Sequence, residues 1–399
     1  MVRNHLLLAI GGLLAMAASI GVGRFVYTPI LPPMIEALSL TKAQAGLIAS
    51  ANFIGYFAGA LLAAVRLPGT RRAWLLGSLA VNAICLAAMG LVTSLPPFLL
   101  LRLVAGAASA FALIFSSALV LDQLARAGRG PLSAVHFAGV GSGIAVSAAL
   151  VAVLVSHGAA WSTLWFASAA LALGAGLAVA WMMPPDSTAT VAALPPAKAP
   201  VSVDFILLAT AYGLFGFGYI ITATFIVDMV RGTPAITHLE PYIWVLFGLS
   251  AVPSVALWTK LGRSWGVLRT FAAASVIEAA GVAASALWLH ATGVIVASVF
   301  VGGTFMGLTA LGLIAVRETG DGDPRRRIAL VTASFSFGQI LGPAFAGYVY
   351  DLTGSLAMPS LVAVAALVLS ALLSVLADAQ RRGAARTASA SLAARSPEA

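Results

Sequence analysis

Twelve long apolar segments, separated by short polar turns, dominate this chain of 399 residues. A helix needs about 20 mostly apolar residues to cross the roughly 30 Å hydrocarbon core of a bilayer. By that criterion the predicted spans are residues 6–31, 43–65, 73–94, 97–121, 131–156, 160–183, 205–229, 242–261, 270–290, 292–316, 328–350 and 356–377. Within lipid, a helix satisfies its own backbone hydrogen bonds. The sequence therefore predicts an all-α polytopic membrane protein.

The amino-acid composition supports this class. Hydrophobic residues make up 61% of the chain and charged residues only 9%, whereas a soluble domain carries about 25% charged residues. So little charge excludes a water-soluble globule, a disordered chain and a typical nucleic-acid-binding protein. The single cysteine, Cys85, lies within an apolar run. We therefore expect neither an intramolecular disulfide nor a metal site.

The basic residues predict the orientation of the spans, because cytoplasmic loops of membrane proteins carry an excess of Lys and Arg. With both termini in the cytoplasm, 18 of the 22 Lys and Arg residues fall on the cytoplasmic side. Only Lys42 and Arg231 then fall outside, and Arg24 and Arg102 lie within spans. If every loop is assigned to the opposite side of the membrane, the ratio of cytoplasmic to external Lys and Arg residues is inverted. Both termini are therefore expected to be cytoplasmic.

A proline-rich stretch divides the chain into two parts with six spans each. Residues 184–204 contain five prolines among Ser, Thr and Ala, a composition typical of a linker. This predicts an N-terminal bundle over residues 1–183, a cytoplasmic linker over 184–204 and a C-terminal bundle over 205–378. Residues 379–399 hold arginines among Ala and Ser. We expect them to form a disordered basic cytoplasmic tail near anionic lipid headgroups.

The second part of the chain repeats features of the first at an offset of 195–199 residues. The matching features are the basic turns 66–72 and 263–269, Gly21-x-Gly23 and Gly216-x-Gly218, Gly106 and Gly303, and Gly139-x-x-x-Gly143 and Gly338-x-x-x-Gly342. Two parallel six-helix repeats are a transporter architecture, in which the substrate site lies between the repeats near the midplane of the membrane.

Two motifs connect this architecture with a known family. Residues 101–108 in the fourth span read LRLVAGAA and resemble the Arg-x-x-x-Gly motif in the fourth helix of the major facilitator superfamily. Residues 21–32 read GVGRFVYTPILP and resemble the YbfB-type bacterial subfamily. The overall resemblance covers about residues 5–378. It implies two pseudo-symmetric six-helix bundles in a bacterial inner membrane, alternating access, and a protein that works as a monomer.

Two motifs depart from the pattern of that superfamily. The turn after the second span lacks the usual acidic residue. The Gly-x-x-x-Gly-Pro antiporter motif of the fifth span is incomplete, because Ile144 follows Gly143; the proline stands instead at Pro343 in span eleven. The incomplete motif weakens an interpretation as a drug/proton antiporter. The basic residues of the two turns remain candidates for gating: Arg66, Arg71, Arg72, Arg263 and Arg269.

Charged side chains within a bilayer are costly and are functional candidates by default. Arg24 in span one shares a helix face with Tyr27, and Arg102 lies in span four. The resemblance places both spans beside the central cavity, where two guanidinium groups would favour a carboxylate. Alternatively, each arginine binds helix carbonyls and only sets packing. The motif around Arg102 favours gating or proton coupling for that residue.

Three further ionisable residues are candidates for proton coupling, together with Arg102. Glu278 lies near the middle of span nine among small residues, Asp228 ends span seven, and His136 lies in span five. Each has a plainer alternative: a structural hydrogen bond for Glu278, an interfacial position for Asp228 and helix packing for His136. Uncharged polar residues complete the candidate substrate-binding set: Tyr27, Asn52, Tyr56, Tyr219 and Gln339.

We expect a proton-coupled secondary transporter for a small organic solute, with the two arginines favouring an anion. The chain has no Gly-Lys-Ser/Thr phosphate loop, which argues against ATP-driven transport, and no cofactor is expected. The alternatives are a multidrug/proton exporter and, from another class, a non-transporting receptor or lipid-handling scaffold. A receptor usually carries a soluble output domain, and a membrane-embedded enzyme needs a clustered His, Asp or Cys constellation. The sequence shows neither. Membrane lipids and protons are the expected partners, and nucleic acid is not.

Overall fold

The computed structural model describes residues 5–393 except 64, 66, 184–201 and 319–323, and this part of the chain is built of helices joined by short turns. The elements are α1 (His5–Met16), the π-helix η1 (Ala17–Val22), α2 (Tyr27–Leu38), α3 (Lys42–Ala63), α4 (Arg71–Met89), α5 (Leu95–Arg126), the 3-10 turn η2 (Gly130–Leu132), α6 (Ser133–Ser156), α7 (Trp161–Met182), α8 (Val203–Arg231), the 3-10 turn η3 (Thr237–Leu239), α9 (Glu240–Ala251), α10 (Ser254–Trp265), α11 (Val267–Leu287), α12 (Ala291–Glu318), α13 (Pro324–Thr353) and α14 (Ala357–Ala393).

The helices confirm the predicted all-α polytopic fold. Among the described residues, 11 helical segments are long and apolar enough to span a membrane, and there are 12 if α9 and α10 form one bent span. These two helices meet at an angle of 41°. Pro253 lies at the bend, immediately before α10, and its ring removes a backbone donor at that point. The eighth predicted span is therefore a kinked helix.

The first predicted span is a broken helix. It begins as α1, continues as the π-helix η1, passes through a turn at residues 23–26 and resumes as α2. In a regular helix the amide of residue 29 would bond to the carbonyl of Phe25, but Pro29 has no N–H. The amide of Thr28 bonds to Phe25 O, at 3.3 Å, in place of Arg24 O. The break therefore frees backbone oxygens in the middle of a transmembrane segment.

We call α1–α7 the N-terminal half and α8–α14 the C-terminal half. Within each half, glycines let neighbouring helices pack backbone to backbone. A Cβ at Gly106 of α5 would overlap the carbonyl of Asn52 in α3, and one at Gly338 of α13 would overlap the carbonyl of Gly213 in α8. These glycines form small-residue packing seams of the kind common in membrane proteins.

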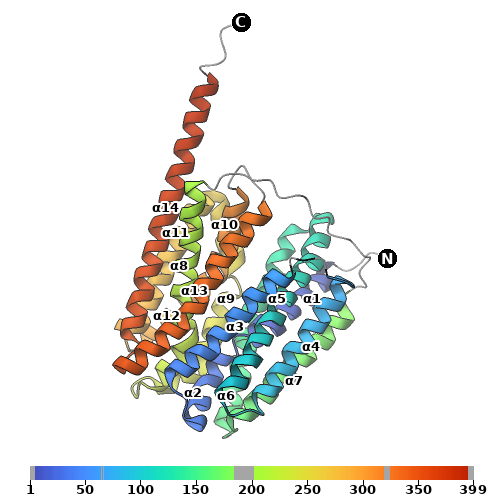
Figure 1. Ribbon diagram of the computed structural model, residues 1–399, viewed down its shortest axis with the longest axis vertical. Helices are drawn as coiled ribbons and strands as arrows, with labels where there is room; N and C mark the ends of the chain where they lie inside the picture. The colour runs from blue at the N-terminus through green and yellow to red at the C-terminus, as the bar shows by residue number, and fades with distance from the viewer. Residues whose placement is uncertain (1–4, 64, 66, 184–201, 319–323, 394–399) are drawn as a thin grey trace.

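The halves contact each other most closely at the end of the molecule opposite to the start of α1 and the end of α14 (lower end in Figure 1). There, α3 packs against α13 so tightly that a Cβ at Gly46 would overlap the carbonyl of Pro343. The Lys42–Asp228 and Arg231–Glu36 ion pairs also cross between the halves at this end. At the upper end, Arg71–Asp122, Arg269–Asp378 and Arg381–Asp204 each join helices of one half.

The structure corrects one expectation about the C-terminal segment. Disorder was expected after residue 378, but α14 continues as a helix to Ala393 and extends beyond the bundle (Figure 1). The segment is rich in Ala and Arg, which have high helix propensity. Most of the predicted linker, residues 184–201, lies outside the described residues, as do residues 394–399 of the predicted tail.

Candidate functional site

Arg24 lies in the turn that interrupts the first span, and its side chain is buried between aromatic rings. The residue is 6% exposed. Its Cζ lies 4.1 Å from the ring centroid of Tyr56 and 5.2 Å from that of Phe53, both on α3. The ring of the neighbouring Phe25 lies 5.9 Å away. These rings stabilise the positive charge through cation–π contacts.

Two nitrogens of this guanidinium, Nε and Nη2, are buried without a hydrogen-bond partner among the described residues. They form the same edge of the planar group, where their N–H bonds are parallel. This edge is the one that binds both oxygens of a carboxylate in a bidentate arrangement. A buried donor without an acceptor costs free energy, more so when it is charged. The geometry of Arg24 thus leaves two charged donors on one edge without an acceptor among the described residues.

Arg102 of α5 has a different role from that of Arg24. It donates from Nη1 to Gly23 O at 3.3 Å and from Nη2 to Arg24 O at 3.2 Å. Its Cζ also lies 5.0 Å from the ring centroid of Tyr27. Arg102 therefore supplies donors to carbonyls that the break in span one exposes, which matches the carbonyl-binding alternative of the sequence analysis.

Other side chains, which were not among the residues predicted from the sequence, bind the same broken segment. Asn82 of α4 and Ser109 of α5 both donate to Ser19 O, at 3.0 and 2.8 Å. Trp244 of α9, in the other half, donates from Nε1 to Phe25 O at 3.1 Å. The intramembrane position of Asn82 was a usable signal in the sequence. Nothing local indicated Trp244.

Some of the predicted polar residues form hydrogen bonds that join neighbouring helices, and others belong to an aromatic cluster. Tyr27 donates to Ala45 O at 2.8 Å, and Asn52 donates to Arg102 O at 3.0 Å, so both fasten neighbouring helices. Tyr219 of α8 and Gln339 of α13 are hydrogen-bonded at 2.5 Å. Tyr56, under Arg24, is the member of the set that approaches it most directly.

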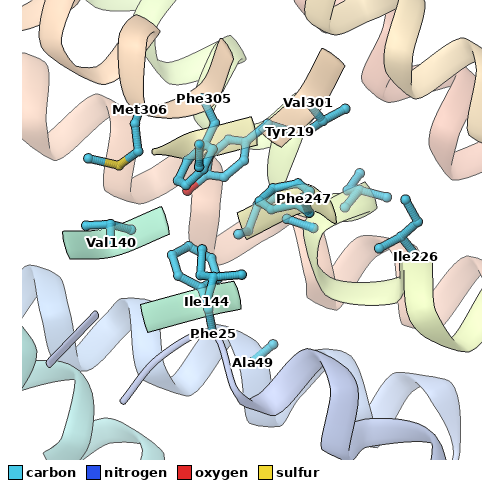
Figure 2. Packing of buried hydrophobic residues seen from close by; sticks show 14 of the residues in the cluster. Phe25, Ala49, Val140, Ile144, Tyr219, Ile226, Phe247, Val301, Phe305 and Met306 are labelled. Carbon is cyan, nitrogen blue, oxygen red and sulfur yellow. The ribbon is translucent and has the colours of Figure 1, made fainter. Parts of the chain in front are cut away.

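Tyr219 belongs to an aromatic and aliphatic cluster between the halves. Its ring stacks on Phe305 at 5.7 Å and on Phe215 at 5.2 Å, while Phe25 of the N-terminal half contacts Phe305 edge-on at 5.8 Å. Figure 2 shows residues from both halves facing each other here: Phe25, Ala49, Val140 and Ile144 from one, and Tyr219, Ile226, Phe247, Val301, Phe305 and Met306 from the other. The side chains in this region, next to Arg24, are therefore mostly aromatic and aliphatic.

Glu278 of α11 is fully buried, and its Oε2 has no partner among the described residues. Its Oε1 lies 3.1 Å from Oγ1 of Thr304 on α12. The same hydroxyl lies 2.6 Å from Phe300 O, which can only accept a hydrogen bond. A hydroxyl carries one proton, and the shorter contact places that proton on the side of Phe300. Glu278 Oε1 then either shares this proton as a second acceptor or, if the carboxyl group is protonated, donates to the hydroxyl.

The remaining candidates lie away from Arg24. His136 is buried, with its Nε2 3.2 Å from the hydroxyl of Ser117 in the packed interior of the N-terminal half. Asp228 is in the inter-half ion pair with Lys42 at the lower end. A cavity of about 380 Å³ adjoins that ion pair. Among the described residues, neither His136 nor Asp228 forms a hydrogen bond or an ion pair with the aromatic cluster.

The basic turns are partly described. Arg71 pairs with Asp122 at 3.3 Å, and Arg269 pairs with Asp378 at 3.0 Å. Arg72 donates to Met183 O and Ala180 O at the end of α7, and Arg263 lies in the last turn of α10. Arg66 lies outside the described residues. Within the described part of the chain, no group of three or more His, Cys, Asp or Glu side chains could hold a metal ion.

Comparisons with known proteins agree with this architecture. The family model described as "Uncharacterised MFS-type transporter YbfB" matches residues 16–375. Among solved structures, a mutant of the nucleoside transporter NupG has a TM-score of 0.71 at 16% identity, covering 93% of this chain and 99% of that chain. A bacterial homologue of the human lysosomal transporter Spinster, in an inward-facing and unoccupied conformation, has a TM-score of 0.63 at 16% identity, covering 94% and 95%. At this identity the likeness shows the fold alone. No curated protein sequence matches the chain.

Proposed function

The chain belongs to the YbfB-type family of major facilitator superfamily transporters, and from this premise we propose that it carries a small organic anion across the membrane by alternating access, coupled to protons. The observation that carries the anion proposal is the unpartnered Nε–Nη2 edge of Arg24, buried at the broken span. A bidentate carboxylate would satisfy both donors at once.

The surroundings of Arg24 favour a planar substrate. The rings of Tyr56, Phe53 and Phe25 lie around the guanidinium, and the stacked rings around Tyr219 belong to the opposite half. Aromatic groups pack well against such surfaces in offset or edge-on geometry. We therefore infer that an aromatic monocarboxylate fits better than an aliphatic di- or tricarboxylate, whose second charge would find no further cationic partner among the described residues of the aromatic cluster.

Proton coupling is supported by Glu278. The contact distances around Thr304 favour a protonated carboxyl group in this conformation, and no ion pair of Glu278 is found among the described residues. Ionisable residues that lie inside a membrane protein commonly serve as proton relays. We propose that Glu278 holds the coupled proton in the state described here and releases it in another state of the transport cycle.

The proposed location is a bacterial inner membrane, with both termini and residues 184–204 in the cytoplasm. The excess of Lys and Arg on that side supports this orientation. In that frame, the contacts between α3 and α13 close the external end of the molecule. The described state is then closed to the outside, and the Spinster homologue that it resembles is inward-facing.

Binding measurements on the purified protein test the anion proposal. We expect benzoate to raise the melting temperature of the wild type, since a ligand of the folded state stabilises it. Arg24→Gln should weaken benzoate binding by about 1.5–3 kcal/mol, the worth of a hydrogen bond to a charged group. The neutral isostere benzamide should bind equally to both forms. Arg381→Gln is a matched control, because Arg381 pairs with Asp204 within the C-terminal half.

The same assay separates the competing functions. Stabilisation by organic cations alone would favour the multidrug/proton exporter, although the charge of Arg24 opposes a cation at this position. Stabilisation by uridine with no response to any carboxylate would favour a neutral planar solute, and the anion proposal would be abandoned. A chain that binds none of these but retains lipids through purification would point to the lipid-handling alternative.

A further inference from the structure

The two halves of the molecule hold successive backbone oxygens at Arg24. The carbonyl of Arg24 accepts a hydrogen bond from Arg102, which is in the same half. The next carbonyl, of Phe25, accepts one from the indole of Trp244, which is in the opposite half and 219 positions along the chain. The two successive peptide units that follow Arg24 and Phe25 are thus each bound by one side-chain donor, the first from the N-terminal half and the second from the C-terminal half.

Trp244 is a rigid donor. The residue is 1% exposed, and its ring stacks on Phe247 with 4.3 Å between ring centroids and contacts Phe25 at 6.3 Å. Helix α9 packs on α6 through glycine: a Cβ at Gly248 would overlap the backbone nitrogen of Ala145. The indole is therefore held firmly by its packing, and its distance from Phe25 O depends on the position of the C-terminal half relative to the broken span.

A second hydrogen bond ties the same segment across the interface. Thr28, four residues after Arg24, donates from Oγ1 to Ala223 O of α8 at 2.7 Å. Both bonds join the segment carrying Arg24 to the C-terminal half, on α9 and α8. Movement of the halves apart at this level would break both of them and leave Phe25 O, within a transmembrane segment, with the long 3.3 Å bond from the amide of Thr28.

We propose that Trp244 is a positioning residue for Arg24, which makes the direction of the anion-binding edge depend on contact between the two halves. The proposal rests on the proposed function, because it takes Arg24 as the anion site. When Trp244 withdraws, the carbonyl of Phe25 loses its donor from the C-terminal half, and the backbone that carries the guanidinium of Arg24 is held less firmly. Anion binding and closure of the halves then favour each other, as linkage requires.

The chain offers a matched control in Trp258. Its Nε1 also donates to a backbone carbonyl, that of Gly303, at 2.8 Å, but donor and acceptor both lie in the C-terminal half. Trp244→Phe and Trp258→Phe each remove one indole donor and keep an aromatic ring. A purely structural hydrogen bond would give the same result at both positions, whereas the proposal requires different results.

A cysteine reporter measures closure without any ligand. Cys85 is replaced by Ala, and Ser50→Cys is introduced on α3, where Ser50 is 3% exposed and donates to Ile340 O of α13 at 2.7 Å. In this background, Trp244→Phe should raise the rate of labelling by a bulky maleimide about two- to tenfold, the range of one hydrogen bond. Trp258→Phe should leave the rate unchanged. Equal rates in the two variants would overturn the proposal.

Binding of benzoate provides the second measurement. Trp244→Phe should weaken it about two- to tenfold, and this loss should vanish when Arg24→Gln is already present, since the effect acts through Arg24. A loss that persists in the Arg24→Gln background would overturn the positioning role. If the wild type does not bind benzoate, the proposed function has failed at this probe, while the labelling comparison still decides whether Trp244 holds the halves together.

Discussion

Lys42, at the start of α3, forms an ion pair with Asp228, near the end of α8, with Nζ 2.5 Å from Oδ2. The two side chains are only 15% and 11% exposed, and they belong to different halves. Next to them, the carboxylate of Asp351 on α13 accepts hydrogen bonds from the amides of Lys42 and Ala43, at 3.0 Å each. The C-terminal half thus caps the N-terminus of α3, where a carboxylate also complements the helix dipole.

These contacts predict an electrostatic latch that keeps the lower end closed. Lys42→Gln should speed labelling of the Ser50→Cys reporter about threefold, because a partly exposed ion pair contributes about 1 kcal/mol at most. Exchanging the charges with Lys42→Asp and Asp228→Lys together should restore part of the slow labelling. Arg381→Gln removes an ion pair of similar exposure within one half and should have no effect. Equal labelling rates in all variants would show that the ion pair does not keep the lower end closed.

The spans and the family were predictable because their signals are local. Apolar runs and the spacing of glycines are properties of short segments, and Pro253 marks the kink between α9 and α10 in the sequence itself. Arg24 was found as a candidate because a charge within an apolar run is rare. The glycine repeats were found because close helix packing needs small residues at fixed spacing.

The partners of these residues were not predictable from the sequence. Lys42 and Asp228 are 186 positions apart, and Trp244 and Phe25 are 219 apart, so only the packing of the halves brings them together. The break in span one also depends on tertiary contacts, since donors on Asn82, Arg102 and Trp244 stabilise its free carbonyls. The sequence motif gave Arg102 a gating or coupling role; the structure shows it bound to two of those carbonyls.

Reporter fusions test the orientation. A reporter at residue 190, between the two halves, and another after residue 393, at the end of α14, should both be active in the cytoplasm. The physical reason is the concentration of Lys and Arg on that side of the membrane. Alkaline phosphatase activity, which requires export, should be low at both positions. High activity at either one would contradict the orientation.

The role of Arg102 predicts a graded response to substitution. Arg102→Ala should lose about 2–4 kcal/mol of stability, because it leaves Gly23 O and Arg24 O without two charged donors. Arg102→Lys keeps the charge but cannot place two parallel donors on neighbouring carbonyls. We expect it to unfold at a higher denaturant concentration than Arg102→Ala and still to bind benzoate more weakly than the wild type. Wild-type binding by the lysine variant would show that charge alone is sufficient.

The hydrogen-bond geometry at Glu278 predicts that its neutral isostere is compatible with the fold. In Glu278→Gln, the amide can donate to Thr304 Oγ1, as the protonated carboxyl group does in our interpretation, so the melting temperature should change little. Glu278→Ala removes that donor and leaves a cavity in the buried contact with Thr304. We expect it to lose about 2–4 kcal/mol of stability, as buried large-to-small substitutions commonly do.

Transport by the same variants then tests proton coupling. In proteoliposomes, an imposed pH gradient should drive benzoate accumulation by the wild type but not by Glu278→Gln, because the amide cannot release a proton. Exchange of labelled for unlabelled benzoate at equal pH should continue in Glu278→Gln, since no net proton movement is needed. Thr304→Val, which removes the hydroxyl without removing the carboxyl group, should retain gradient-driven uptake. Normal accumulation by Glu278→Gln would assign the coupled proton to another group.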